Sequence, residues 1–98
     1  MPEIALGQLV IPRAGRDKGR VMIVVRIIDS DYVYIADGDL RKVEKPKKKK
    51  IKHLKVLNKI SKDISLRLAK KRKLSNEEIK LTLEKLIDDN VNKASNQI

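Results

Sequence analysis

The chain has no cysteine, a single histidine, no phenylalanine or tryptophan and only two tyrosines among its 98 residues. Without cysteine it has neither a disulfide framework nor a thiolate metal site, and one histidine cannot form a histidine cluster. No apolar run approaches the roughly 18–20 residues of a membrane span, so no membrane partner is expected. The first ten residues lack the basic-then-apolar order of a secretion signal, and a cytoplasmic location is therefore predicted.

Catalytic patterns are also missing from the sequence. It holds no phosphate-cradling glycine loop, no Ser/His/Asp set and no paired carboxylates in an acid–base context. The pairs Asp29/Asp31 and Asp37/Asp39 have a weak metal-ligand spacing, but turn formation explains both pairs. His53 has no nucleophile to assist and is interpreted as a packed or surface residue. We therefore predict a protein that is not an enzyme and that has no cofactor, no bound metal and no small-molecule substrate.

What the sequence has in excess is positive charge. It carries 24 Lys and Arg against 13 Asp and Glu, a formal net charge of +11. A small chain this basic is usually drawn to polyanions, chiefly nucleic acid. The charge is uneven, with +8 in residues 41–58 and +6 in residues 59–74, but −1 before and −2 after them. The attraction for a polyanion is therefore predicted to lie mainly between Arg41 and Lys73.

The first 58 residues have the pattern of short strands. Residues 21–28 alternate with period two and are apolar on both sides, which a strand inside a tightly curled barrel allows. Asp37-Gly38 is a hairpin signal, because glycine accepts positive φ. The run Lys47–Lys50 is interpreted as a solvated loop. The predicted strands cover residues 6–11, 21–28, 32–35, 40–43 and 51–57. Five short strands in so few residues indicate a small SH3-like β-barrel.

After Asn58 the apolar period changes to that of helices. Ile60, Ile64 and Leu68 fall on one helical face, and Ser75 with Glu78 matches a capping box. A second helix then carries an apolar stripe, which consists of Ile79, Leu83, Leu86, Ile87 and Val91. The predicted fold is mainly β with an α appendage, namely a barrel over residues 1–58 and a two-helix extension over residues 59–98.

The segment QLVIPRAGRDKGRVMIVV, residues 8–25, resembles the KOW motif, in which a basic loop closes on a glycine between apolar strands. Here that glycine is Gly19. The downstream ADGDLRKV, residues 36–43, and the KHL ending at Leu54 extend the resemblance over about residues 6–57. Together they are similar to the KOW-type large-subunit ribosomal proteins of archaea and eukaryotes. The resemblance implies an SH3-like barrel that binds RNA, chiefly ribosomal RNA, through its loops. Related KOW barrels also occur in bacterial transcription antitermination factors, where some contact protein partners.

Candidate RNA-contacting residues are the cations of the basic loop and of the lysine-rich segment. They are Arg13, Arg16, Lys18, Arg20, Arg41, Lys42, Lys45, Lys47, Lys48, Lys49, Lys50, Lys52 and Lys55. Gly15, Gly19 and Gly38 are predicted to serve as structural turn residues. Asp17 is interpreted as a residue that orients its turn by hydrogen bonding.

Several of these residues have a second interpretation. Arg16 and Lys18 either contact phosphate or keep a turn soluble. Tyr32 and Tyr34 either stack on bases or lie half-buried in the barrel. The lysine run can dominate affinity even as a mobile loop, because lysines act as point charges.

These observations give a leading hypothesis and an alternative. The leading hypothesis is a non-enzymatic RNA-binding protein, ribosomal or ribosome-associated, that contacts ribosomal RNA phosphates through the KOW loop and the lysine-rich segment. The alternative is a protein-interaction or assembly module in transcription or ribosome biogenesis, whose amphipathic last helix docks a protein partner. Integral and transient association with the ribosome both remain open.

Overall fold

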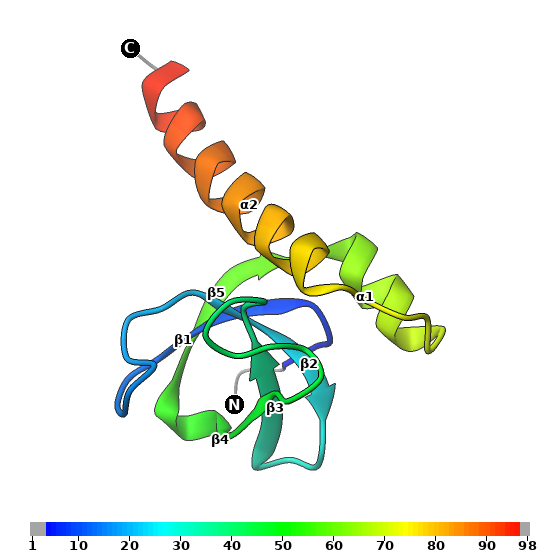
Figure 1. The fold of residues 1–98 in the computed structure, drawn as a ribbon. Helices are drawn as coiled ribbons and strands as arrows, with labels where there is room; N and C mark the ends of the chain where they lie inside the picture. The colour runs from blue at the N-terminus through cyan, green and yellow to red at the C-terminus, as the bar shows by residue number, and fades with distance from the viewer. Residues whose placement is uncertain (1–3, 97–98) are drawn as a thin grey trace.

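Five antiparallel strands and two helices make up the fold (Figure 1). The computed structural model describes residues 4–96, with side chains to residue 87. The elements are β1 (Gln8–Pro12), β2 (Met22–Ile27), β3 (Tyr32–Ala36), β4 (Lys47–Lys50), the 3-10 turn η1 (Ile51–His53), β5 (Leu54–Ile60), α1 (Lys62–Ala69) and α2 (Asn76–Asn96). The sheet order is β4-β3-β2-β1-β5, and η1 joins the two outermost strands. The prediction of a mainly β, SH3-like fold with a two-helix tail is confirmed.

The fourth strand is not where the sequence placed it. Residues 40–43 lie in turns, and the strand is the lysine run Lys47–Lys50, which pairs with β3 over its whole length. The prediction of a strand at residues 40–43 and a loop at the lysines was therefore wrong. Lysine is a weak strand former, but an edge strand draws its stability from backbone hydrogen bonds and tolerates charged side chains.

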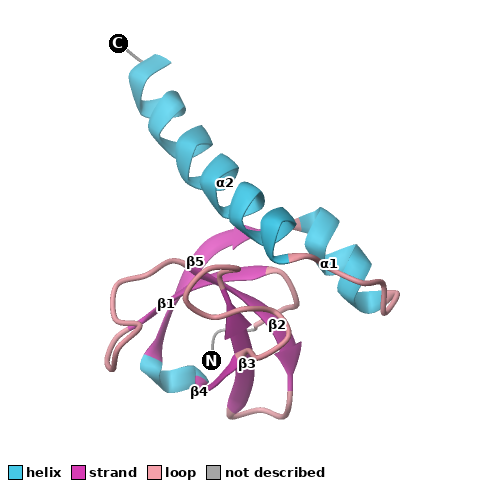
Figure 2. Cartoon of the chain, viewed as in Figure 1, coloured by secondary structure: helices cyan, strands magenta, loops and turns pink. Residues whose placement is uncertain are grey.

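Most side chains of β1, β2 and β3 are buried, and they lie on both faces of these strands. One face fills the barrel interior with Val10, Met22, Val24, Val33 and Ile35, and Leu54 of β5 completes this cluster. The other face lies under the helices, and its cluster contains Leu9, Ile23, Val25, Ala36, Ile64, Leu74, Ile79 and Leu83. Figure 2 shows both helices on one side of the strands, with η1 at the other end. The helices, as well as the curl of the sheet, therefore account for strands that are apolar on both sides.

Both helices begin at a serine cap. The Ser61 hydroxyl accepts the Ile64 N–H at 3.2 Å, and the Ser75 hydroxyl accepts the Glu78 N–H at 3.1 Å. Each cap satisfies one of the donors that a helix start leaves without a partner. The Glu78 carboxylate pairs with Arg67 of α1 and thereby joins the two helices.

The start of α2 is fixed to the barrel by polar and apolar contacts. The side chain of Asn76 accepts the Val43 N–H at 2.7 Å and donates to the Glu44 carboxylate at 2.8 Å. Ile79 and Leu83 are buried in the helix-covered cluster. The first half of the apolar stripe therefore faces the barrel and not a partner, and Val91 lies outside the described side chains. Neither helix, over the described residues, has the length and apolar character needed to cross a bilayer.

Candidate nucleic-acid interface

The loop between β1 and β2, residues 13–21, is closed by its own backbone. We call it the basic loop. The Gly19 N–H donates to the Pro12 carbonyl at 3.0 Å, and the Lys18 N–H donates to the Gly15 carbonyl at 3.2 Å. Gly15 and Gly19 have φ of +88° and +83°, which side-chain-bearing residues rarely adopt. A Cβ at Gly19 would meet no neighbour, so the backbone angle alone calls for glycine there. Arg13, Arg16 and Lys18 are exposed on this loop.

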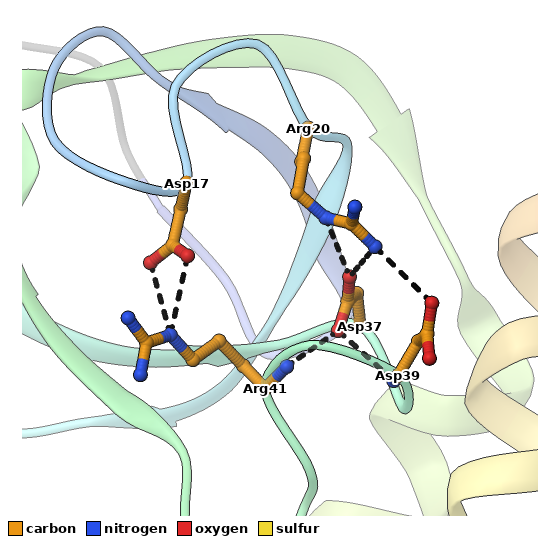
Figure 3. Close-up of polar contacts among 5 residues, drawn as sticks. All are labelled: Asp17, Arg20, Asp37, Asp39 and Arg41. Carbon is orange, nitrogen blue, oxygen red and sulfur yellow. Dashed lines mark hydrogen bonds and ion pairs between the residues drawn. The ribbon is translucent and has the colours of Figure 1, made fainter.

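A buried ion pair ties the basic loop to the turn that follows β3. Asp17 is 1% exposed, and both of its carboxylate oxygens accept from Arg41 Nε, at 3.1 and 3.2 Å (Figure 3). A carboxylate so deeply buried is costly unless it is paired and hydrogen-bonded. The pairing therefore fixes the loop against residues 37–41. The sequence indicated only that Asp17 orients its own turn, so this longer-range contact is an additional role.

A second carboxylate, that of Asp37, organises the same turn. Its Oδ1 accepts the N–H groups of Asp39 at 3.0 Å and Arg41 at 2.8 Å, while Oδ2 accepts from Arg20 Nε and Nη2 at 3.1 and 2.8 Å. Burial alone would raise the pKa of Asp37. The Arg41 N–H, the Arg20 guanidinium and the Asp39 N–H together outweigh burial, and the pKa lies below its ordinary value. The hydrogen bond to Asp37 in turn raises the pKa of Arg20.

Gly38 in this turn has a backbone φ of +80° and a crowded environment. A Cβ at this position would collide with the carbonyl oxygen of Asn76, at the start of α2. The turn that holds Arg41 and Asp37 therefore depends on a glycine that lets the helix approach closely.

These ion pairs divide the predicted site residues of the loop region into two kinds. Arg20 and Arg41 hold buried carboxylates, so part of their hydrogen-bonding capacity is already used. Arg13, Arg16 and Lys18 are more exposed than Arg41. The sequence reasoning missed these pairings. One available signal was the net charge of −1 over residues 1–40, which shows that the loop arginines have enough nearby carboxylates to pair with.

The strand pairing sorts the lysines of β4 onto two faces. Lys48 and Lys50 stand opposite Tyr34 and Tyr32, and the Nζ atoms of the two lysines lie 4.8 and 5.8 Å from the centre of the Tyr32 ring. Such cation–π contacts restrain the ammonium groups without neutralising them. Tyr34 packs against the helix-covered cluster, and Tyr32 is half-buried. Of the two tyrosines, Tyr32 is thus the one whose ring lies among the strand lysines.

The other face of β4 reaches the basic loop. Lys49 Nζ donates to the Ala14 carbonyl at 3.4 Å. The Arg13 N–H donates to the His53 carbonyl of η1 at 3.0 Å. The basic loop, β4 and η1 therefore meet at one end of the barrel, and cations that are far apart in the sequence form one basic surface.

The remaining predicted cations lie along the same stretch of chain. Lys42 and Lys45 are exposed in the turn before β4, where the Lys45 N–H donates to the Lys42 carbonyl at 2.9 Å. Lys47 is exposed at the start of β4, and Lys52 is exposed in η1. Lys55 is exposed on β5 opposite Ile11 of β1.

The chain was compared with protein families and with known proteins. No family model matches the chain. A large ribosomal subunit protein eL14 from Staphylothermus marinus is 34% identical over 60 residues, which are 61% of this chain and 62% of the relative. The eL14 protein of Desulfurococcus amylolyticus is 39% identical over 54 residues, 55% of this chain and 56% of the relative.

The chain is thus distantly similar to archaeal eL14 over about three fifths of its own length. The predicted resemblance to KOW-type large-subunit ribosomal proteins is therefore confirmed. The matched region spans about three fifths of the length of these eL14 relatives.

Proposed function

We propose that this chain is a non-enzymatic RNA-binding protein of the ribosome, which contacts ribosomal RNA phosphates through the basic loop and the lysines of β4. The observation that carries the proposal is the meeting of these two basic segments at one end of the barrel, and the similarity of the chain to eL14 supports it. In this proposal, residues 1–58 carry the RNA contacts and residues 59–98 form a helical extension that stabilises the barrel. The protein then acts in the cytoplasm, with the large ribosomal subunit as its partner.

The two basic segments contribute differently to binding. Arg16 and Lys18 project from a loop held by main-chain hydrogen bonds and buried ion pairs, so their positions are defined before RNA arrives. The lysines of β4 are point charges on a strand that is fixed by its backbone. Each phosphate that they neutralise releases counterions, which is the main source of affinity for a polyanion.

Ribosomal association is tested by sedimentation of the full chain with separated ribosomal subunits across a salt series. We expect the chain to travel with the large subunit at low salt. Resistance to high salt would identify an integral component, and release at moderate salt would identify a transient one. If about six phosphates are contacted, the slope of log affinity for ribosomal RNA against log salt is roughly −4 to −5. Failure to bind either subunit or ribosomal RNA at low salt would refute the proposal.

A further inference from the structure

A cavity of about 300 Å³ opens beside η1 at the end of the barrel where the basic segments meet. Four parts of the chain contribute to its wall, namely the basic loop, the β2–β3 turn, the β4–η1 junction and β5. The principal lining residues are Arg13, Asp31, Lys50, Ile51, Lys52 and Leu54. Leu54 and Ile51 also belong to the barrel interior or pack against it, so the cavity has an apolar floor continuous with the core.

Main-chain hydrogen bonds hold the walls of this cavity together. The Arg13 N–H donates to the His53 carbonyl at 3.0 Å, and the Ile51 N–H donates to the Asp31 carbonyl at 2.7 Å. Asp29 fixes the conformation of the β2–β3 turn, because its Oδ1 accepts the Asp31 N–H at 2.8 Å. The cavity is therefore preformed, as small-ligand sites usually are.

The chemistry of the lining suits the base and the phosphates of a nucleotide. Ile51 and Leu54 offer apolar surface to a base, and Arg13, Lys50 and Lys52 offer positive charge to its phosphates. Asp31 offers a carboxylate, which accepts hydrogen bonds from an amino group on a base edge. A site for inorganic phosphate alone would gain nothing from a carboxylate, and an apolar ligand would gain nothing from three cations.

We propose that this cavity takes one unpaired nucleotide of the bound RNA. The base lies on Ile51 and Leu54, the Asp31 carboxylate accepts from its amino group, and Arg13 and Lys52 bind the flanking phosphates. Proteins read RNA sequence chiefly at such unstacked nucleotides, because the bases of a duplex are inaccessible to side chains. The inference rests on the proposed function and adds to it a preference for RNA with an unpaired base over continuous duplex.

The first test compares two hairpin RNAs that differ by one bulged nucleotide, with binding to the full chain followed by fluorescence anisotropy. We expect the bulged hairpin to bind about tenfold more tightly than the fully paired one, which is the effect of one added hydrogen bond to a charged group. The variant Lys52→Ala removes most of that preference. The matched control Lys62→Ala removes the same charge from the exposed start of α1, and it keeps the preference.

The second test identifies the base contact. Four hairpins carry A, C, G or U as the bulged nucleotide, and Asp31→Asn replaces the carboxylate with an amide of the same shape. We expect the wild type to favour bases with an amino group, and the variant to shift toward uridine, whose carbonyl oxygens accept from the new amide. Addition of a free nucleoside monophosphate competes with the bulged hairpin only weakly, because it lacks the neighbouring phosphates.

The outcomes separate this inference from the proposed function. Equal, salt-dependent binding of bulged and paired hairpins by the wild type would overturn the cavity assignment and leave ribosomal RNA binding in place. A bulge preference that survives both Lys52→Ala and Asp31→Asn would also overturn it. No binding to any RNA would overturn both.

Discussion

The basic loop and the lysines of β4 carry charge of the same sign but are built differently. In the loop region the carboxylates of Asp17 and Asp37 are nearly inaccessible to solvent, and each is bound by an arginine. Among the residues that the structure describes, the ion pairs involve Arg20, Arg41 and Arg67 but none of the β4 lysines. The strand is held instead by its ladder with β3 and by the Tyr32 ring.

The loop region therefore contributes a fixed geometry to the surface, and β4 contributes most of the net charge. A buried ion pair fixes a loop, because removing either partner leaves the other charge without compensation. It also neutralises the arginine that forms it, and a loop built this way adds little net charge. A strand fixed through its backbone needs no carboxylate partner, so the charge of its ammonium groups is not neutralised. We therefore expect mutations in the loop region to change stability most, and mutations in β4 to change RNA affinity most.

The largest effect is expected from Arg41→Ala. The substitution leaves the Asp17 carboxylate buried without its guanidinium partner, which is expected to cost about 3 kcal/mol in free energy of unfolding. Urea denaturation followed by circular dichroism measures the loss. The control Arg16→Ala removes an exposed arginine of the same loop and should stay within about 0.5 kcal/mol of the wild type. A loss below about 1 kcal/mol for Arg41→Ala would show that the ion pair does not fix the loop.

A somewhat smaller effect, on RNA affinity, is expected when Lys47 to Lys50 are all replaced by Gln. Affinity for ribosomal RNA should fall by roughly 30-fold at physiological salt, and the salt slope should become shallower by about 3. Because backbone pairing is retained, the urea midpoint should change little.

The matched control for the β4 lysines is the quadruple replacement of Lys70, Lys71, Arg72 and Lys73 by Gln. It removes the same four charges from the exposed segment after α1. We expect it to reduce affinity less than the β4 replacement. Equal losses of affinity would mean that RNA binding depends only on the total charge of the chain. The β4 lysines would then have no special part in binding.

The smallest effect is a pH dependence of stability that arises from Asp37 in the loop region. The folded state lowers the pKa of Asp37 from its ordinary value of 3.8, so the ionised carboxylate stabilises the fold above that value. This contribution is lost as the pH falls through the folded pKa. Thermal melting between about pH 7 and pH 2.5 should therefore show a steeper acid loss for the wild type than for Asp37→Asn. Parallel acid profiles would show that Asp37 does not stabilise the turn through its charge.

The sequence predicted the strands and helices whose side chains repeat regularly. Residues 21–28 alternate with period two, and Ser75 precedes a helical apolar stripe, so β2 and α2 were both expected. The strand at Lys47–Lys50 gave no such signal, because its four identical side chains have no periodicity and lysine is a weak strand former. Its pairing depends on the position of β3, which side-chain patterns in β4 do not encode.

The sequence identified the cations of the candidate site, but it did not show that they lie together on one surface. The basic loop and the lysine run were recognisable from composition, yet their contact through Lys49 and Ala14 joins residues 35 positions apart. The pairing of Arg41 with Asp17 spans 24 positions. The cavity beside η1 likewise needs four separate segments, and no single stretch of sequence contains enough of its wall to indicate it.

The sequence by itself determined the excess of positive charge, the alternating apolar strands, and the resemblance to KOW-type ribosomal proteins. These properties depend on residue type and local spacing, which the order of residues states directly. The tertiary structure alone decided which arginines are held by buried carboxylates, which lysines lie beside Tyr32, and where a nucleotide-sized cavity opens. Each of these depends on strand register and on contacts between distant segments, and a shift of one residue in that register would turn the β4 lysines to opposite faces.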